Sequence, residues 1–349
     1  MARSGTLLVD TSFLGDVLCA EPMVRAAAEQ WPGQDIDFLT STGGAQMLAG
    51  HPLLRNILVF DKRGVDKGLT GLLGLAKKLR RQEFARAICS HRSWRTAVLL
   101  RPARIPERVG FDNASAAWMY SKRVKYRKDL HEVERNLQLL GGGEWTAPRM
   151  YPGEAEKQRA AELVPDGDWV AMAPGSIWAT KRWPAAKWSQ LVKQLTAAGQ
   201  SCLLMGGPDD AELCAGIVEV AGFGQSSDIG PDGRRQKTAP LLDLSGKTSL
   251  RESAAVLERC AVMVSNDSAP MHLGVSAGIP VVAVFCSTIP AFGFAPRGEN
   301  DVVIEVGELD CRPCGIHGHK VCPKGHFKCG EDISADVVFD ATMQRLTKQ

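Results

Sequence analysis

The sequence lacks long apolar runs, and aromatic side chains are scarce. No stretch approaches the roughly 18 consecutive apolar residues that a membrane span needs. The first apolar stretch, residues 6–10, is too short for the core of a signal peptide. Aromatics make up 6% of the 349 residues, which argues against nucleic-acid binding by interleaved aromatic and basic side chains. With neither repeats nor low-complexity tracts, we expect a cytoplasmic globular protein.

Two nucleotide-binding signatures are also missing. Neither G-x-G-x-x-G nor G-x-x-x-x-G-K-[ST] follows the first apolar stretch. The sequence therefore indicates neither a dinucleotide fingerprint nor a P-loop.

Charge is present but unevenly divided. Residues 1–150 carry 23 Lys and Arg against 15 Asp and Glu, a net charge of +8, which leaves −5 for the remainder. A basic first half favours an anionic partner or a membrane surface, although a solvated basic face has the same composition.

Short apolar stretches alternate with helical patterns in both halves, which predicts two α/β domains with parallel sheets. Glycines at 141–143 and prolines at 148 and 152 indicate a linker, so we place the domains at 1–150 and 151–349. The expected strands are residues 6–10, 35–39, 56–60, 85–90, 169–173, 201–205, 261–265 and 281–285. Ligands of doubly wound sheets bind beyond the carboxyl ends of strands, so we expect the active site in a cleft between the domains.

The turn after the first strand carries Gly15 and Asp16 where a helix begins. Asp16 suits a general base that projects into the cleft. The alternative is a carboxylate that only stabilises the helix N-terminus through the helix dipole.

The first strand of the second half ends in Pro-Gly-Ser at 174–176, and Lys-Arg-Trp-Pro follows at 181–184, before a helix from about Ala185. Hydroxyls, cations and a helix N-terminus make a credible phosphate site. The alternative is a surface loop whose tryptophans pack on the helix.

A third turn, residues 265–272, follows another apolar strand. Asp267 and Ser268 are expected to cap the next helix, and capping alone would explain the presence of either residue. The same turn also faces the expected ligand site. His272 either lines that site or is a structural histidine.

Together these three segments resemble glycosyltransferase family 9, the ADP-heptose:lipopolysaccharide heptosyltransferases, over nearly the whole chain. The Lys-Arg-Trp-Pro form is more similar to heptosyltransferase II than to heptosyltransferase I. The resemblance implies a GT-B architecture, in which two Rossmann-like, doubly wound domains face a central cleft. The first domain would hold the acceptor and the second the nucleotide sugar.

The resemblance also implies transfer of L-glycero-D-manno-heptose from ADP-heptose to the inner core of lipopolysaccharide, with inversion and without a catalytic cofactor. Asp16 matches the family's proposed base. The positions that match donor-binding residues are Ser176, Lys181, Glu212, Asp267, Ser268 and His272. The alternative enzyme is another GT-B transferase or an epimerase that uses a uridine nucleotide. The nucleobase of the donor, adenine or uracil, would separate this alternative from an ADP-heptose-dependent transferase.

The implied acceptor is a phosphorylated lipid A–Kdo–heptose, which the protein would reach as a peripheral protein on the inner face of the inner membrane. Arg92, Arg95 and the basic run 122–128 are candidates for holding the acceptor or the anionic membrane. The run is equally typical of a solvated face.

Ten cysteines fall into two groups. Six are scattered through apolar segments and are expected to be core thiols. Cys311, Cys314, Cys322 and Cys329 form a C-x2-C-x7-C-x6-C cluster, with histidines interspersed. In a reducing cytoplasm such a cluster indicates a structural zinc or other metal. The alternatives are a reduced loop or, in another class, a metal-stabilised nucleic-acid-binding protein. We expect the cluster, at 311–329, to be separate from the catalytic site.

Overall fold

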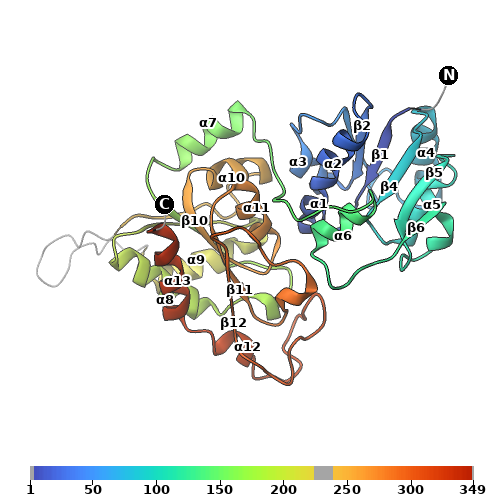
Figure 1. Cartoon of the computed structure of the whole chain (residues 1–349). Coiled ribbons are helices and arrows are strands. Elements are labelled where there is room, and N and C mark those ends of the chain that lie inside the picture. Colours follow the sequence, from blue (N-terminus) through green and yellow to red (C-terminus); the bar gives the residue numbers. More distant parts are fainter. Residues whose placement is uncertain (1–3, 224–238, 348–349) are drawn as a thin grey trace, which may run out of the picture. The chain divides into compact units, whose positions relative to one another are not determined.

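The computed structural model describes residues 4–223 and 239–347. The chain divides into two compact units, Met1–Tyr151 and Pro152–Gln349 (Figure 1). Each unit consists of one sheet with helices packed on it.

The first unit has a six-stranded parallel sheet in the order β3-β2-β1-β4-β5-β6. Its strands are β1 (Thr6–Val9), β2 (Ile36–Thr40), β3 (Asn56–Val59), β4 (Arg86–Cys89), β5 (Glu107–Phe111) and β6 (Lys122–Val124). Its helices are α1 (Leu14–Ala20), α2 (Pro22–Gln30), α3 (Thr42–Leu48), α4 (Gly68–Arg81), α5 (Trp94–Leu100) and α6 (Glu132–Gln138).

The second unit has a six-stranded parallel sheet in the order β12-β11-β10-β7-β8-β9. Its strands are β7 (Trp169–Ala173), β8 (Ser201–Leu204), β9 (Leu241–Asp243), β10 (Cys260–Asn266), β11 (Val281–Phe285) and β12 (Val302–Glu305). Its helices are α7 (Glu154–Leu163), α8 (Ala185–Ala197), α9 (Ala211–Val220), α10 (Leu250–Leu257), α11 (Ala269–Ala277), α12 (Lys328–Glu331) and α13 (Ala335–Leu346).

Both sheets have the Rossmann strand order, which places a topological switch point between β1 and β4 in one unit and between β7 and β10 in the other. Connections leave the two central strands toward opposite faces there. Ligands of doubly wound sheets generally bind beyond the carboxyl ends of these two strands. The expected α/β class with doubly wound sheets is confirmed.

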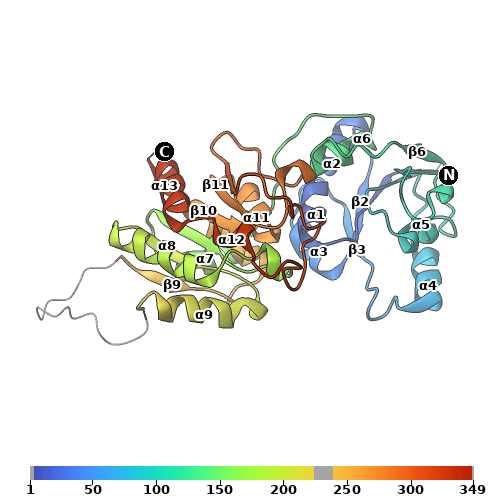
Figure 2. The ribbon, with the colours of Figure 1, turned by 90° about the horizontal axis from the view of Figure 1, so that it is seen from below.

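Alternation along the strands divides the core of the first unit between the two faces of its sheet. In β1, Leu7 and Val9 pack with Leu72 and Leu79 of α4, whereas Leu8 packs on the other face with helices α1 and α2. All of these side chains are buried. The period-two alternation of a strand thus supplies apolar surface to helices on both faces (Figure 2).

Four strands were not predicted: β5, β6, β9 and β12. Three of them lie at a sheet edge or end, and β6 and β9 have only three residues each. In β6 the side chains of Lys122 and Arg123 are exposed. An edge strand needs no apolar run, and exposed cations there discourage pairing with another chain.

Candidate active site

Polar loops follow the two strands at the switch point of the second unit. Asn266, the last residue of β10, joins them: its Nδ2 donates to the carbonyl of Pro174 (2.7 Å), and its Oδ1 accepts from the backbone N–H of Trp183 (3.0 Å). Asn266 is fully buried, so both bonds are shielded from water. The segments at 174–176 and 265–268 are therefore brought together.

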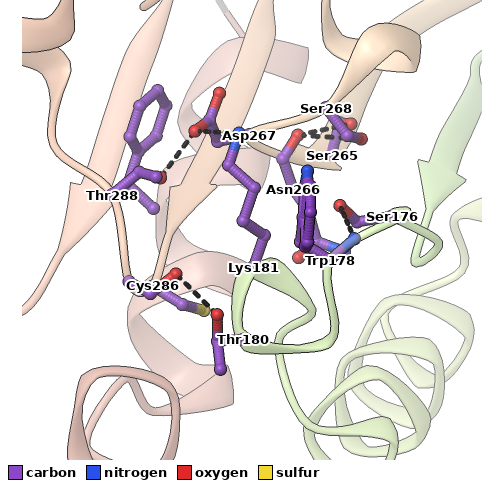
Figure 3. A network of polar contacts seen from close by, with 12 residues as sticks. Ser176, Trp178, Thr180, Lys181, Ser265, Asn266, Asp267, Ser268, Cys286 and Thr288 are labelled. Atoms are coloured by element: carbon purple, nitrogen blue, oxygen red, sulfur yellow. Dashed lines mark hydrogen bonds and ion pairs between the residues drawn. The ribbon is translucent and has the colours of Figure 1, made fainter. Parts of the chain in front are cut away.

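Lys181 and Asp267 form an ion pair in this site. Lys181 Nζ lies 2.7 Å from Asp267 Oδ2, and the Thr288 hydroxyl donates to the same oxygen (2.5 Å) (Figure 3). The Lys181 side chain is 14% exposed and the Asp267 side chain 8%. A cation that is largely withdrawn from water interacts strongly with an anion brought beside it. Asp267 therefore holds the Lys181 ammonium in place, and the ammonium's remaining N–H groups can donate to a phosphate.

Asp267 and Ser268 do not cap α11 with their side chains, contrary to expectation. Ser268 occupies the N-cap position without a side-chain capping bond. Its hydroxyl instead donates to the carbonyl of Gly175 (3.3 Å), while Asp267 faces Lys181. The Ser268 side chain therefore does not occupy the N–H groups of the first turn of α11, where a helix can bind an anion. Ser176 lies in the neighbouring loop, where its Oγ accepts from the N–H of Trp178 (3.4 Å).

The loop after β8 places Asp210, rather than Glu212, against the 174–176 loop. A Cβ on Gly175 would lie 2.1 Å from Asp210 Oδ1, and the other carboxylate oxygen accepts from the N–H of Gly207 (3.0 Å). Glu212 is exposed in the first turn of α9. Only a glycine at 175 allows this close approach.

His272 is buried within α11, and its ring lies edge-on to Phe294, with 6.4 Å between ring centroids. Burial lowers the pKa of His272 to about 4. The imidazole is thus neutral near pH 7, and it would approach a ligand as a hydrogen-bonding group rather than as a cation.

Asp16 lies in the first turn of α1, at the switch point of the first unit, and is partly buried. Burial raises the pKa of its carboxyl from 3.8 to about 8, and the nearby carboxylates of Asp10 and Glu132 add to the rise. The Arg92 guanidinium opposes it. A carboxylate with a raised pKa is a stronger base than an ordinary aspartate, as general-base catalysis near neutral pH requires.

A polar cluster around Asp10 lies at the carboxyl ends of β1 and β4. One carboxylate oxygen of Asp10 accepts from the Ser90 hydroxyl (2.6 Å), and the other accepts from both the N–H (2.9 Å) and the hydroxyl of Ser12. Asp10 and Ser90 are buried. These bonds fix the start of the loop that leads to Asp16.

A second set of bonds surrounds His91, directly after this cluster. His91 Nδ1 lies 2.8 Å from Thr11 Oγ1 and 2.9 Å from Thr96 Oγ1, and Lys62 Nζ donates to the carbonyl of Thr11 (2.8 Å). Burial lowers the pKa of His91 to about 4. This group was not predicted from the sequence. The signal was the polar run at 90–93, which follows β4 as 10–12 follows β1.

Arg92 and Arg95 differ in their surroundings. The Arg92 guanidinium lies over the Tyr126 ring, 4.3 Å from its centroid, and is close enough to lower the pKa of Asp16. The Arg95 guanidinium lies 5.7 Å from the centroid of the Trp94 ring. Both arginines are exposed. The structure therefore brings Arg92 to the Asp16 site, whereas Arg95 is near Lys62, whose pKa it helps to lower.

The cysteine cluster does not form a set of metal ligands in the described part of the chain, where no group of three His, Cys, Asp or Glu could hold a metal ion. Cys311 Sγ lies 3.8 Å from His326 Nε2, and the Cys314 thiol donates to the carbonyl of Cys311 (3.0 Å). Cys329 is buried in the core of the second unit. None of these four cysteines, Cys322 included, is in a disulfide. The residues as arranged do not fit the expected metal.

The cysteine-rich segment contacts the loop that carries Lys181. The N–H of His319 donates to Thr180 Oγ1 (2.7 Å), and the N–H of Thr180 donates to the carbonyl of His319 (3.0 Å). Thr180 directly precedes Lys181. Spacing along the chain did not indicate this contact, because 139 positions separate its partners.

None of the helices in the described ranges has the length and apolar character to cross a membrane.

Comparisons with known proteins agree with this arrangement of sheets and loops. The family model described as glycosyltransferase family 9 (heptosyltransferase) matches residues 72–324. Lipopolysaccharide heptosyltransferase 1 of Pseudomonas aeruginosa is 26% identical over 322 residues, covering 88% of this chain and 85% of that protein. Lipopolysaccharide heptosyltransferase 2 of Salmonella typhimurium is 23% identical over 303 residues, covering 82% and 84%.

The fold also matches a solved structure, that of E. coli ADP-heptose lps heptosyltransferase II, with a TM-score of 0.80, 20% identity and 99% coverage of both chains. This likeness shows the GT-B fold. Relatives of types 1 and 2 match at comparable identity, so the resemblance to heptosyltransferase II stays a prediction. Because the family model covers well over half of the sequence, the chain belongs to glycosyltransferase family 9, the heptosyltransferases.

Proposed function

We propose that this glycosyltransferase transfers L-glycero-D-manno-heptose from ADP-heptose to the inner core of lipopolysaccharide, with inversion at the anomeric carbon. The observation that carries the proposal is the largely buried Lys181–Asp267 pair in the loops that follow β7 and β10. Its position beside the N-terminus of α11 suits the diphosphate of a nucleotide sugar.

The proposed reaction is one in-line displacement. The carboxylate of Asp16 removes the proton from the acceptor hydroxyl while the hydroxyl oxygen forms a bond to the anomeric carbon. The bond from that carbon to the β-phosphate oxygen breaks, and ADP leaves with the electron pair. A single displacement inverts the configuration, and the raised pKa of Asp16 suits it to the base role.

Charge develops on the leaving diphosphate. Lys181 and the N–H groups at the start of α11 would stabilise this charge, because they are in place before the reaction and need little reorganisation. Ser176 and Ser268 supply hydroxyls in the same loops, and neutral His272 completes this side of the proposed donor site.

The residue that holds the donor's ribose is proposed from the resemblance as Glu212. Asp210 is the competing candidate, because its carboxylate lies against Gly175. Loss of ADP affinity in Glu212→Ala but not in Asp210→Ala would support Glu212.

We also propose that the first unit holds the acceptor and contacts an anionic membrane. Arg92 lies near Asp16, and Arg95 and residues 122–128 add positive charge. Helix α4 supports membrane contact further: Leu69 and Leu73 are exposed on it, and its last turn carries Lys78, Arg80 and Arg81. Exposed leucines beside cations are typical of helices that lie on anionic lipid.

The proposed reaction is tested by ADP release from ADP-heptose, with core acceptors truncated before the first or before the second heptose. Turnover only on the acceptor that already carries one heptose would support the heptosyltransferase II step. Turnover only on the heptose-free acceptor would assign the first step. A preference for UDP-sugars over ADP-heptose would favour the uridine-dependent alternative.

A structural metal on Cys311, Cys314, Cys322 and Cys329 stays a prediction from their spacing. No step of the proposed reaction depends on it.

A further inference from the structure

The cysteine-rich segment is anchored to the loop that carries Lys181. Thr180 is buried, and its Oγ1 accepts two hydrogen bonds: from the N–H of His319 (2.7 Å) and from the hydroxyl of Ser287 (3.1 Å). The N–H of Thr180 donates in return to the carbonyl of His319 (3.0 Å). Thr180 and His319 are thus joined by two hydrogen bonds, one through the Thr180 hydroxyl and one between backbone groups, which fix the position of the loop at Thr180.

Gly318 makes this approach possible. It has a φ of +79°, and a Cβ at this position would lie 2.9 Å from Thr180 Oγ1, 3.0 Å from Ser287 Oγ and 3.2 Å from Lys181 Cγ. The first two atoms belong to the hydroxyls that anchor the loop, and the third belongs to the aliphatic part of the Lys181 side chain. Any larger residue at 318 would therefore press on Lys181 as well as on its anchor.

Other contacts hold the segment in place on both sides of Gly318. The N–H of Cys314 donates to the carbonyl of Ser287 (2.9 Å), and Cys329 is buried in the core of the second unit. The His317 ring stacks on Trp178, with ring centroids 6.2 Å apart and planes at 20°. The segment thus touches the Lys181 loop at Trp178, Thr180 and Lys181.

We propose that residues 317–319 are a positioning element for Lys181. They hold the Lys181 side chain where it meets Asp267 and the donor's phosphates. Lys181 lies in a short 3-10 turn, Ala179–Lys181, whose own backbone bonds are few. The hydrogen bonds between Thr180 and His319 add to the few backbone bonds within the turn. The inference rests on the proposed role of Lys181 in donor binding, which the experiment tests separately.

The chain contains a matched pair of glycines for this test. Gly318 and Gly315 both have positive φ, +79° and +85°, but a Cβ on Gly315 would meet nothing within 4 Å. Gly318→Ala and Gly315→Ala therefore impose similar backbone strain, and only the first presses on Thr180 and Lys181. We expect Gly318→Ala to raise the dissociation constant for ADP about tenfold and Gly315→Ala to change it less than about twofold.

Thr180 provides a second pair of variants. Thr180→Val removes the hydroxyl that accepts both anchoring bonds while it keeps the side-chain shape, and Thr180→Ser keeps the hydroxyl. We expect Thr180→Val to weaken ADP binding and Thr180→Ser to leave it nearly unchanged. Calorimetric binding and melting temperatures on the full chain would separate lost affinity from lost folding.

The outcomes separate the two proposals. If Lys181→Ala leaves ADP affinity unchanged, the donor role of Lys181 fails. If Lys181→Ala weakens binding but Gly318→Ala behaves like Gly315→Ala, the positioning role is overturned. If Gly318→Ala costs nothing further when Lys181 is already alanine, the segment acts through Lys181, because non-additivity is the mark of a shared interaction. Additive losses would contradict that route.

Discussion

At the scale of single residues, the two switch points contain groups whose charge is set by burial. Asp16 has a pKa raised to about 8, and His272 has one lowered to about 4. Lys181 keeps a carboxylate partner in Asp267. Burial thus favours a neutral Asp16 carboxyl and a neutral His272 imidazole.

Replacing Asp16 tests the proposed base. Asp16→Asn should lower turnover by about 100-fold or more and leave ADP affinity nearly unchanged, because general-base catalysis contributes on this scale. Steady-state kinetics and calorimetric ADP binding would measure both. Turnover like that of the unmodified chain would remove Asp16 from the mechanism.

The raised pKa of Asp16 also predicts a pH dependence of activity and stability. The base form appears as the pH rises through about 8, so turnover should increase toward that pH. The unfolded chain loses this proton near pH 3.8 and the folded protein near 8, so the contribution of Asp16 to stability falls as pH rises between those values. Asp16→Asn should abolish this part of the slope in urea unfolding. An unchanged slope would argue against the shifted pKa.

Removing Lys181 tests the phosphate contact. Lys181→Ala should weaken ADP binding by roughly 1.5 to 3 kcal/mol, the usual value of a hydrogen bond to a charged group. It also leaves Asp267 without its cation, so the melting temperature should fall. Lys193→Ala, at an exposed position of α8, is the control that removes a charge away from the site and should alter neither quantity.

At the scale of elements, the cysteine-rich segment between β12 and α13 contacts Thr180, which the spacing of its cysteines does not indicate. Its four thiols do not converge on one point in the described residues, yet its backbone holds Thr180. The contact with Thr180 therefore does not require the four thiols to converge.

A metal on the cysteine cluster would have measurable consequences. Protein purified under reducing conditions should contain about one zinc per chain if the four thiols bind it, and strong chelator with acid should remove it. Because the segment contacts Thr180, metal removal should then weaken ADP binding as well as lower stability. Elemental analysis that finds neither zinc nor iron would reject the site.

At the scale of the whole molecule, the two halves of the chain have sheets of one topology but opposite net charge. Residues 1–150 have 23 Lys and Arg against 15 Asp and Glu, and acidic residues are in excess in the remainder. The excess of positive charge coincides with the unit that contains Asp16, Arg92 and the exposed leucines of α4. Such a division suits one unit to an anionic lipid-linked acceptor.

Membrane contact through α4 can be measured directly. Replacing Leu69 and Leu73 together by serine should reduce co-sedimentation with anionic vesicles several-fold, because buried apolar area and charge attraction both contribute to interfacial binding. Val220→Ser, at an exposed apolar position of α9, is the matched control. Equal binding of the two variants would contradict this surface. Turnover on a deacylated, soluble acceptor should stay unchanged in both.

The sequence by itself determined the α/β class, eight of the strands and the motif residues at strand ends. It could do so because the period-two and helical patterns are local, and because parallel strands end at one edge of a sheet. Strands such as β6 left no apolar pattern, since an edge strand with exposed Lys122 and Arg123 needs none.

Only the tertiary structure decided what each polar group contacts. Asp267 looked like a helix cap and pairs instead with Lys181. Asp10 and His91 form clusters of which the sequence shows only the polar runs after β1 and β4. The pKa of Asp16 and the fit of Gly318 against Thr180 likewise depend on segments far away along the chain. Burial and long-range hydrogen bonds arise from packing, and packing leaves no periodic trace in the sequence of either partner.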